Sequence, residues 1–240
     1  MRHPLYKVIT LMTFLISTQA IAQTSGLGSW SVLSGKYTFN KHWNIYAEAQ
    51  IRSQQMVHDF FYYEYKGGLG YNFKNNGSVL VAAGHYATYQ PTGEFTNPNV
   101  TEFRLWEQFV LNNNIGRVKL EHRYRIEQRF ISSNYRNRFR YRINALLPFG
   151  HKVIEKKTLY ASLYEEIFVS NENPFFEQNR IFAGLGYQID DHLTVLGGFI
   201  NRFDNTVNHT QVSKNFLQLN LFFTIAEFKS GRERHPSALD

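Results

Sequence analysis

The stretch KLEHRYRIEQRF, residues 119–130, alternates charged side chains with largely apolar ones. Arginine and glutamate at such spacing could pair with each other, bind anions or transfer protons. Side chains at every second position share one face of a β-strand, whereas on a helix the apolar residues here would scatter around the whole circumference. The stretch is therefore predicted to be a strand with one ionic face and one apolar face. The ionic face contains Lys119, Glu121, Arg123, Arg125, Glu127 and Arg129.

A second alternating stretch, YRNRFRYRI, follows at residues 135–143. A hairpin folded at Ser132 and Ser133 would place the two ionic faces side by side. The opposed residues are then Arg129 with Arg136, Glu127 with Arg138, Arg125 with Arg140, and Arg123 with Arg142. Three of these four pairs carry like charges, and directly opposed like charges destabilise a sheet. Carboxylates on the neighbouring strands must therefore compensate.

We expect these carboxylates to be Glu102 on the preceding strand and Glu166 on the following one. If the preceding turn is centred on the run NNNIG, Glu102 lies beside Arg125 and Arg104 beside Arg123. Glu166 could then pair with Arg140 or Arg142. The predicted ionic network, which is also a possible anion site, consists of Glu102, Arg104, Glu121, Arg123, Arg125, Glu127, Arg129, Arg136, Arg138, Arg140, Arg142, Glu166 and Arg180.

The elements that must position these residues repeat the same two-residue period along the whole chain. Eleven such segments are visible, most of them long enough for the roughly 9–11 residues of a tilted membrane strand. The sequence therefore predicts an all-β fold, a single closed antiparallel transmembrane β-barrel of about 10–12 strands, covering residues 23–226. Because bacterial barrels usually have even strand numbers, ten or twelve strands are expected, with twelve preferred. Glu107 and Glu165 fall on the apolar face, which predicts a β-bulge or a position near a rim.

The ends of the chain and its composition favour the envelope of a Gram-negative bacterium. Residues 1–22 combine basic residues, a short apolar run and an Ala-x-Ala site, which together predict a cleaved signal peptide. Residues 227–240 form a polar tail, expected to lie in the periplasm. Short connections alternating with longer ones, and aromatic residues at 16% of the chain, are typical of outer-membrane barrels. The net charge of +7 would suit nucleic acid, but an exported chain does not normally meet it, so no nucleic-acid partner is expected.

For the lumen, the sequence leaves two interpretations open. The first is a structural network of ion pairs that fills a polar barrel interior. The second is binding or narrow conduction of small anionic solutes by the surplus arginines. Arginine dominates over lysine, which favours fixed, forked pairing. Glycines on the lumen side are expected to make room for arginine side chains or to bend a strand.

Two further function classes stay open. One is a lipid- or glycan-modifying enzyme, for which Glu48, Glu64 or Glu166 could act as acid or base, although no serine is obviously placed beside His122. The other is a soluble periplasmic β-protein. The nine histidines show no metal-ligand spacing, so neither a metal ion nor another cofactor is expected. The expected partners are outer-membrane lipid, small anionic solutes and, during biogenesis, the barrel assembly machinery.

The runs RYRIEQRF and YRNRFRYRI, followed by LYASLYEEIF and FEQNRIFAGLGYQI, resemble an uncharacterised family of small outer-membrane β-barrels. That family is found mainly in Bacteroidota and is defined by a domain of unknown function. The resemblance extends over nearly the whole chain after the signal peptide. It implies a barrel in the outer membrane, but it implies no reaction and no residue roles.

Overall fold

The computed structural model describes residues 26–73, 76–90, 95, 97–132, 134–206 and 210–226. Within these residues the chain forms eleven strands and no helix. The strands are β1 (Gly28–Thr38), β2 (Trp43–Gln55), β3 (His58–Asn72), β4 (Gly77–Thr88), β5 (Val100–Ile115), β6 (Val118–Ile131), β7 (Asn134–Pro148), β8 (Thr158–Ser170), β9 (Phe176–Gln188), β10 (Leu193–Asn205) and β11 (Gln211–Ala226).

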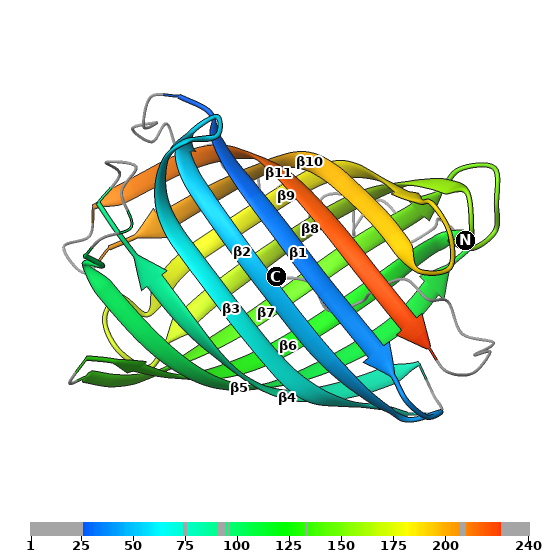
Figure 1. Ribbon diagram of the computed structural model, residues 1–240, viewed down its shortest axis with the longest axis horizontal. Helices are drawn as coiled ribbons and strands as arrows, with labels where there is room; N and C mark the ends of the chain where they lie inside the picture. The colour runs from blue at the N-terminus through cyan, green and yellow to red at the C-terminus, as the bar shows by residue number, and fades with distance from the viewer. Residues whose placement is uncertain are drawn as a thin grey trace, which may run out of the picture.

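The strands close into a single barrel in sequence order, as Figure 1 shows. Each strand pairs antiparallel with the next one, but β1 pairs with β11 in parallel. The all-β closed barrel and the eleven predicted segments are confirmed. The preference for an even number of strands was wrong, and so was the expectation of an entirely antiparallel sheet. In an up-and-down chain with an odd number of strands, the first and last strands run in the same direction, so they can close the barrel only as a parallel pair.

The odd strand number also places the two strand termini at opposite ends of the barrel. We call the end where β1 begins the N end and the end where β11 finishes the C end. The predicted alternation of short and long connections holds only in part. β2 and β3 at the N end are joined by a turn at residues 56–57, whereas β7 and β8 at the C end are joined by the longer segment 149–157.

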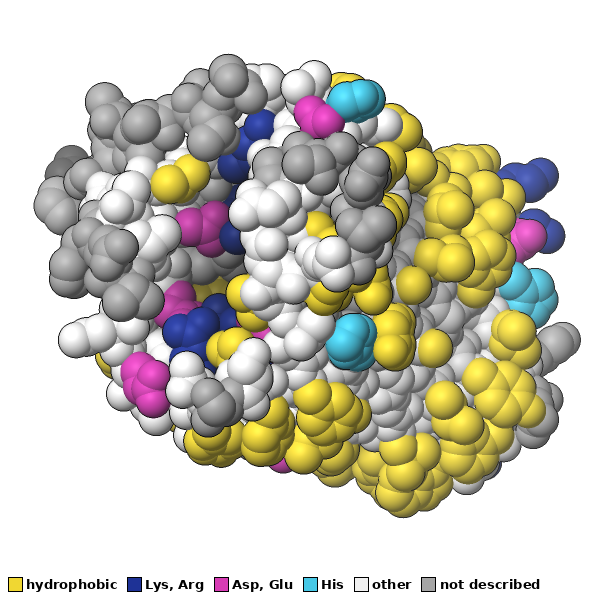
Figure 2. Space-filling model, turned by 60° about the vertical axis from the view of Figure 1, so that its left-hand side comes forward, with side chains coloured by type: hydrophobic (Ala, Val, Ile, Leu, Met, Phe, Trp, Pro, Cys, Tyr) yellow, Lys and Arg dark blue, Asp and Glu magenta, His cyan; other side chains and the backbone are white. Residues whose placement is uncertain are grey.

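The two faces of the sheet follow the sequence pattern. Along β5 and β6, buried and exposed residues alternate through most of each strand. The outward positions carry a belt of exposed Leu, Ile, Val, Phe and Tyr side chains, visible over the outer wall in Figure 2. The inward positions hold the ionic side chains. The period-two reading of the chain is therefore confirmed for the strands that position the site.

Glu107 and Glu165 do point outward, and the sheet is regular at both residues. The two register shifts lie elsewhere, at Arg52/Ser53 and Phe168/Val169. Each outward carboxylate instead accepts a hydrogen bond from an amide side chain on the adjacent strand. Gln128 Nε2 donates to Glu107 (3.0 Å) and Asn179 Nδ2 donates to Glu165 (3.0 Å). The predicted bulge was therefore wrong, and both residues lie near the middle of their strands rather than at a rim.

The predicted signal peptide (1–22), the polar tail (227–240) and Ser133 lie outside the described residues. In the part of the chain that the structure covers, no helix is both long enough and apolar enough to cross a membrane.

Candidate functional site

The lumen side of the β6–β7 hairpin is a ladder of arginines and glutamates. The predicted register is confirmed, because Arg129 lies opposite Arg136, Glu127 opposite Arg138, Arg125 opposite Arg140 and Arg123 opposite Arg142. Like charges therefore do face each other across this hairpin. The carboxylates that relieve their repulsion come partly from the hairpin itself and partly from β5, β8 and β9.

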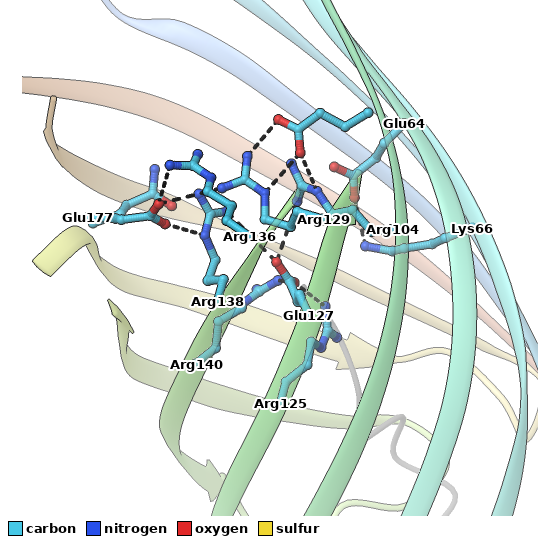
Figure 3. Close-up of polar contacts among 12 residues, drawn as sticks. Glu64, Lys66, Arg104, Arg125, Glu127, Arg129, Arg136, Arg138, Arg140 and Glu177 are labelled. Atoms are coloured by element: carbon cyan, nitrogen blue, oxygen red, sulfur yellow. Dashed lines mark hydrogen bonds and ion pairs between the residues drawn. The ribbon is translucent and has the colours of Figure 1, made fainter. Parts of the chain in front are cut away.

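Glu127 is the centre of this ladder. Its carboxylate lies 2.5 Å from Arg140 Nη1, 3.6 Å from Arg104 Nη1, 3.6 Å from Arg125 Nη1 and 3.8 Å from Arg138 Nη1. These four arginines reach it from β5, β6 and β7, as Figure 3 shows for the labelled residues. The side chain is 0% exposed. One carboxylate is thus shared by four guanidinium groups in a site without access to bulk solvent.

Glu166 on β8 is also shared by arginines, and it lies nearer the C end of the lumen than Glu127 does. Arg140 Nε donates to it at 2.8 Å, and Arg123 also pairs with it. The predicted contact between Glu166 and Arg140 is confirmed. Arg142 lies opposite Glu166 in the register but forms an ion pair with Glu121 at 3.1 Å.

The predicted register between β5 and β6 was wrong. Glu102 lies opposite Ile131 and Arg104 opposite Arg129, instead of opposite Arg125 and Arg123. The asparagines of the NNNIG run remain extended in β5, and the chain reverses later, in a tight turn where Gly116 has a φ of 60°. Glycine reaches such positive φ values at little cost. Glu102 consequently contacts Arg129 Nη2 (2.6 Å) and Arg104 Nε (2.8 Å).

The sequence analysis missed Glu177. This residue pairs with Arg136 at 2.9 Å, with Arg138, and with Arg129 at 3.6 Å. The two-residue period does not find it, because Gln178 and Arg180 already occupy the inward positions of β9. Glu177 turns inward at the start of β9, next to the register shift at Phe168/Val169. Only the irregular pairing of β8 with β9 reveals its role.

A smaller ionic cluster lies on β2 and β3. Lys66 Nζ is 2.7 Å from Glu48 and 2.7 Å from Glu64, and Arg52 reaches Glu64 at 3.4 Å. Tyr46 and Tyr62 donate hydroxyl hydrogen bonds to the same two carboxylates. Glu48 and Glu64, and likewise Glu166, which were considered as acid or base residues, are therefore engaged as ion-pair partners.

Arg180 on β9 differs from the other predicted network arginines near the N end. Its Nε donates to Gln178 (3.0 Å), but it has no ion pair with any carboxylate among the described residues. Its guanidinium carbon lies 4.9 Å from the centre of the Trp30 ring and 4.5 Å from that of Phe168. Aromatic faces attract a guanidinium group but do not neutralise its charge.

A cavity of about 500 Å³ opens at the N end of the lumen, and we call it the vestibule. Figure 2 shows basic and acidic side chains within this hollow mouth. Its wall is rich in arginine, with fewer acids. The arginines are Arg52, Arg104, Arg129, Arg136, Arg138, Arg180 and Arg202, and the acids are Glu102, Glu177 and Asp204.

The lumen is not uniformly polar, which corrects the sequence-based expectation. We call the lumen side of β5, β6 and β7, together with Glu166 of β8, the ionic wall and the lumen side of β9, β10, β11 and β1 the apolar wall. The apolar wall and its neighbours form a continuous buried cluster. The cluster contains Trp30, Val32, Phe61, Tyr62, Tyr86, Leu146, Ile154, Tyr160, Tyr164, Phe182, Leu196, Ile200, Phe216 and Phe222.

The lumen glycines of β9 make room for aromatic rings rather than for arginines. A Cβ atom at Gly186 would overlap the ring of Tyr160, and one at Gly184 would lie 2.6 Å from the Phe182 ring. The Phe182 ring stacks on Tyr164 with centroids 4.9 Å apart. The expectation that these two glycines accommodate arginine was therefore wrong, because their strand faces the apolar cluster.

His122 points outward and shares a hydrogen bond with the Tyr141 hydroxyl (2.9 Å), not with a serine. Across the described ranges, no group of three or more His, Asp or Glu side chains is arranged to hold a metal ion. What the arrangement offers chemically is a set of fixed guanidinium groups that face an open cavity.

A family model described as a protein of unknown function (DUF2490) matches residues 27–213. The match reaches from just before β1 to the first residues of β11 and so includes the ionic wall and the β1, β9 and β10 parts of the apolar wall. It covers more than half of the chain. No curated protein and no solved structure matches the chain.

Proposed function

Since the chain belongs to the DUF2490 family, which is described only as a protein of unknown function, we propose a role from the barrel itself. The protein is an outer-membrane β-barrel with a closed lumen and an anion-binding vestibule at its N end. The Arg/Glu network, together with the aromatic cluster opposite it, fills and closes the lumen, and we call this packing the plug. The network's surplus of arginine at the N end then provides a site for small anionic solutes.

The outer wall supports placement in a membrane. Large apolar side chains are exposed on the outward face of the strands, for example Ile45 (50%), Leu163 (53%) and Leu219 (48%). Water-soluble monomers rarely expose a continuous apolar surface of this kind. The strands contain 11 to 16 residues, which suffices to cross a bilayer with tilt. The partners that follow are outer-membrane lipid and, during folding, the barrel assembly machinery.

The single observation that carries the proposed closed lumen is the burial of side chains across its middle. Arg123, Glu127 and Glu166 on one side, and Phe168, Phe182 and Ile200 on the other, are each 0% exposed. At the C end, Ile154 from the β7–β8 connection is buried in the aromatic cluster and covers that side of the lumen. A hydrated ion therefore has no room to pass through this packing, although it can enter the vestibule.

The excess of arginine at the vestibule favours anions over cations. Arginine presents a rigid fork of donors that matches carboxylate and phosphate oxygens. We place the vestibule at the outer surface of the cell, because β11 finishes at the opposite end and the polar tail that follows it is expected in the periplasm. The vestibule would then meet solutes from outside.

Planar-bilayer recording tests the closed lumen. Purified protein reconstituted next to a general diffusion porin as positive control should give no conductance steps at any voltage between −150 and +150 mV, roughly the range that a bilayer withstands. Steps with anion preference would contradict the plug and support the alternative of a narrow anion pore. Co-fractionation with outer membranes and a heat-dependent shift on a gel should accompany the silent recording.

The orientation can be tested because the chain contains no cysteine. A Ser132→Cys variant at the N end should react with a membrane-impermeant maleimide in intact cells. The matched variant Lys41→Cys at the C end should react only after the outer membrane is opened. The reverse labelling pattern would show that the vestibule faces the periplasm.

A further inference from the structure

Within the vestibule, charge is balanced unevenly. Arg104, Arg129, Arg136 and Arg138 each form an ion pair with Glu102, Glu127 or Glu177. On the opposite side, Arg52 shares Glu64 with Lys66, and Arg202 pairs with Asp204, which also accepts a hydrogen bond from Gln178. Arg180 lies between these two groups and has no ion pair with a described carboxylate.

The sheet brings further positive charge to Arg180. It lies directly opposite Arg202 in the β9–β10 register, and directly opposed like charges are unfavourable. Arg52 and Arg180 also lie over the same indole ring, with guanidinium carbons 3.5 Å and 4.9 Å from the centre of Trp30. The Trp30 ring attracts both guanidinium groups without neutralising their charge.

We propose that Arg180, together with Arg52 and Arg202, binds the phosphate group of a phosphomonoester in the vestibule. This inference rests on the proposed anion-binding role and names its ligand class. A phosphomonoester carries nearly two negative charges at neutral pH and three acceptor oxygens, so it can bridge several guanidinium forks. A single carboxylate brings only one charge and two oxygens, and a dicarboxylate such as succinate carries its two charges on separate groups, so neither presents the charge density of a phosphate to three guanidinium groups at one point.

The size of the vestibule agrees with a small phosphorylated ligand. Its volume of about 500 Å³ lies within the range of ligand pockets, roughly 300–1,000 Å³, and exceeds the need of phosphate alone. Phe61 and Tyr62 line the same cavity and offer an apolar surface to the group that carries the phosphate. The phosphate could belong to a soluble sugar phosphate or to a lipid headgroup at the membrane surface.

Calorimetric titration in zwitterionic detergent tests the site. Inorganic phosphate and glucose 1-phosphate should bind saturably at constant ionic strength, and succinate more weakly. Arg180→Gln should weaken phosphate binding at least about tenfold, the loss expected for a charge-assisted bidentate contact. Asp204→Asn should tighten it severalfold, since it removes the carboxylate that competes for Arg202. The matched control Arg117→Gln at the C end should bind as the wild type does.

A second readout guards against a folding defect. Phosphate should raise the unfolding temperature of the wild type and of Arg117→Gln but not that of Arg180→Gln, because only a ligand of the folded state stabilises it. Unchanged phosphate binding in Arg180→Gln would overturn the proposal. Equal losses in both arginine variants, or succinate binding more tightly than phosphate, would also overturn it.

The source of the phosphate group is decided by a lipid arm. For this test the protein is reconstituted into phosphatidylcholine vesicles that contain a tenth of phosphatidic acid and is then extracted. If a lipid headgroup is the ligand, the wild type should retain phosphatidic acid and Arg180→Gln should not. Binding of glucose 1-phosphate without such retention identifies a soluble ligand, and absence of both overturns the proposal. The closed lumen is tested separately, because bilayer recording does not depend on phosphate. If the barrel gives no conductance and binds no phosphate, the closed lumen stands and the phosphate site is rejected. If the barrel conducts ions and binds phosphate in an Arg180-dependent way, the phosphate site stands and the closed lumen is rejected.

Discussion

The ionic wall and the apolar wall face each other across one lumen and solve the same packing problem in different ways. On the ionic wall, long guanidinium and carboxylate side chains fill the space as ion pairs around Glu127 and Glu166. On the apolar wall, glycines at positions 184, 186 and 198 leave room for the rings of Phe182 and Tyr160. Both walls are almost completely buried. A barrel with an alternating polar pattern can therefore bury the side chains of its interior as the core of a soluble protein does.

The line where the two walls meet shows why they depend on each other. Arg140 and Arg180 both lie 4.5 Å from the centre of the Phe168 ring, and Arg142 lies 5.1 Å from that of Tyr164. Aromatic faces are among the few apolar surfaces that attract a cation. They also exclude water, which strengthens each ion pair but makes any missing partner more costly. The ionic wall should therefore be the more sensitive one to loss of a single group.

The largest effect is expected from removing one carboxylate of the ionic wall. Glu166→Gln keeps the shape of the side chain but leaves Arg123 and Arg140 short of negative charge in a buried site. Unpairing a buried ion pair costs about 3–5 kcal/mol. We expect the free energy of unfolding, measured by urea titration in lipid vesicles with the heat-dependent gel shift as readout, to fall by about this amount.

The adjacent residue provides the matched control. Glu165 lies on the same strand, directly before Glu166, but it points outward and accepts a hydrogen bond from Asn179. Glu165→Gln should change the free energy of unfolding by less than about 0.5 kcal/mol, as is usual for surface substitutions. Equal effects of the two substitutions would remove the distinction between lumen and outer face on which the comparison depends.

A smaller loss is expected from the apolar wall. Phe182→Ala removes a ring that stacks on Tyr164 and fills the space beside Gly184. Large-to-small changes of this kind cost about 3–5 kcal/mol, because the surroundings close the cavity only in part, and the lower end is expected here because no buried charge is left unpaired. The same urea titration measures it, and Phe199→Ala on the outer face of β10 serves as control. A cost above that of Glu166→Gln would mean that the aromatic cluster, and not the network, dominates the plug.

The smallest effect, of opposite sign, is expected outside the lumen. The double substitution Glu107→Leu and Gln128→Leu removes a hydrogen-bonded polar pair from the apolar belt. Replacing both partners leaves no unsatisfied group, and apolar side chains are favoured against lipid. The free energy of unfolding in vesicles should rise by about 1 kcal/mol. A fall of that size would indicate that this patch contacts a polar partner rather than lipid.

The sequence by itself determined which residues of the central hairpin face the lumen and how that hairpin pairs. Side chains alternate strictly along a strand, so the period of two assigns Arg123, Arg125 and Glu127 to one face without any knowledge of the fold. The register of β6 and β7 follows from a short turn whose position the polar run at residues 132–134 marks. These features are local, and local patterns are what a single sequence records.

Only the tertiary structure decided which charges meet and how the barrel closes. The position of the tight turn at Gly116 shifted Glu102 from the expected Arg125 to Arg129, and the irregular start of β9 turned Glu177 inward. The parallel pairing of β1 with β11 and the apolar wall opposite the arginines are also products of closure. Contacts across a lumen join residues that are far apart in the chain, and they depend on the sum of all registers around the barrel. A one-residue change in any turn alters that sum, so no local pattern can specify it.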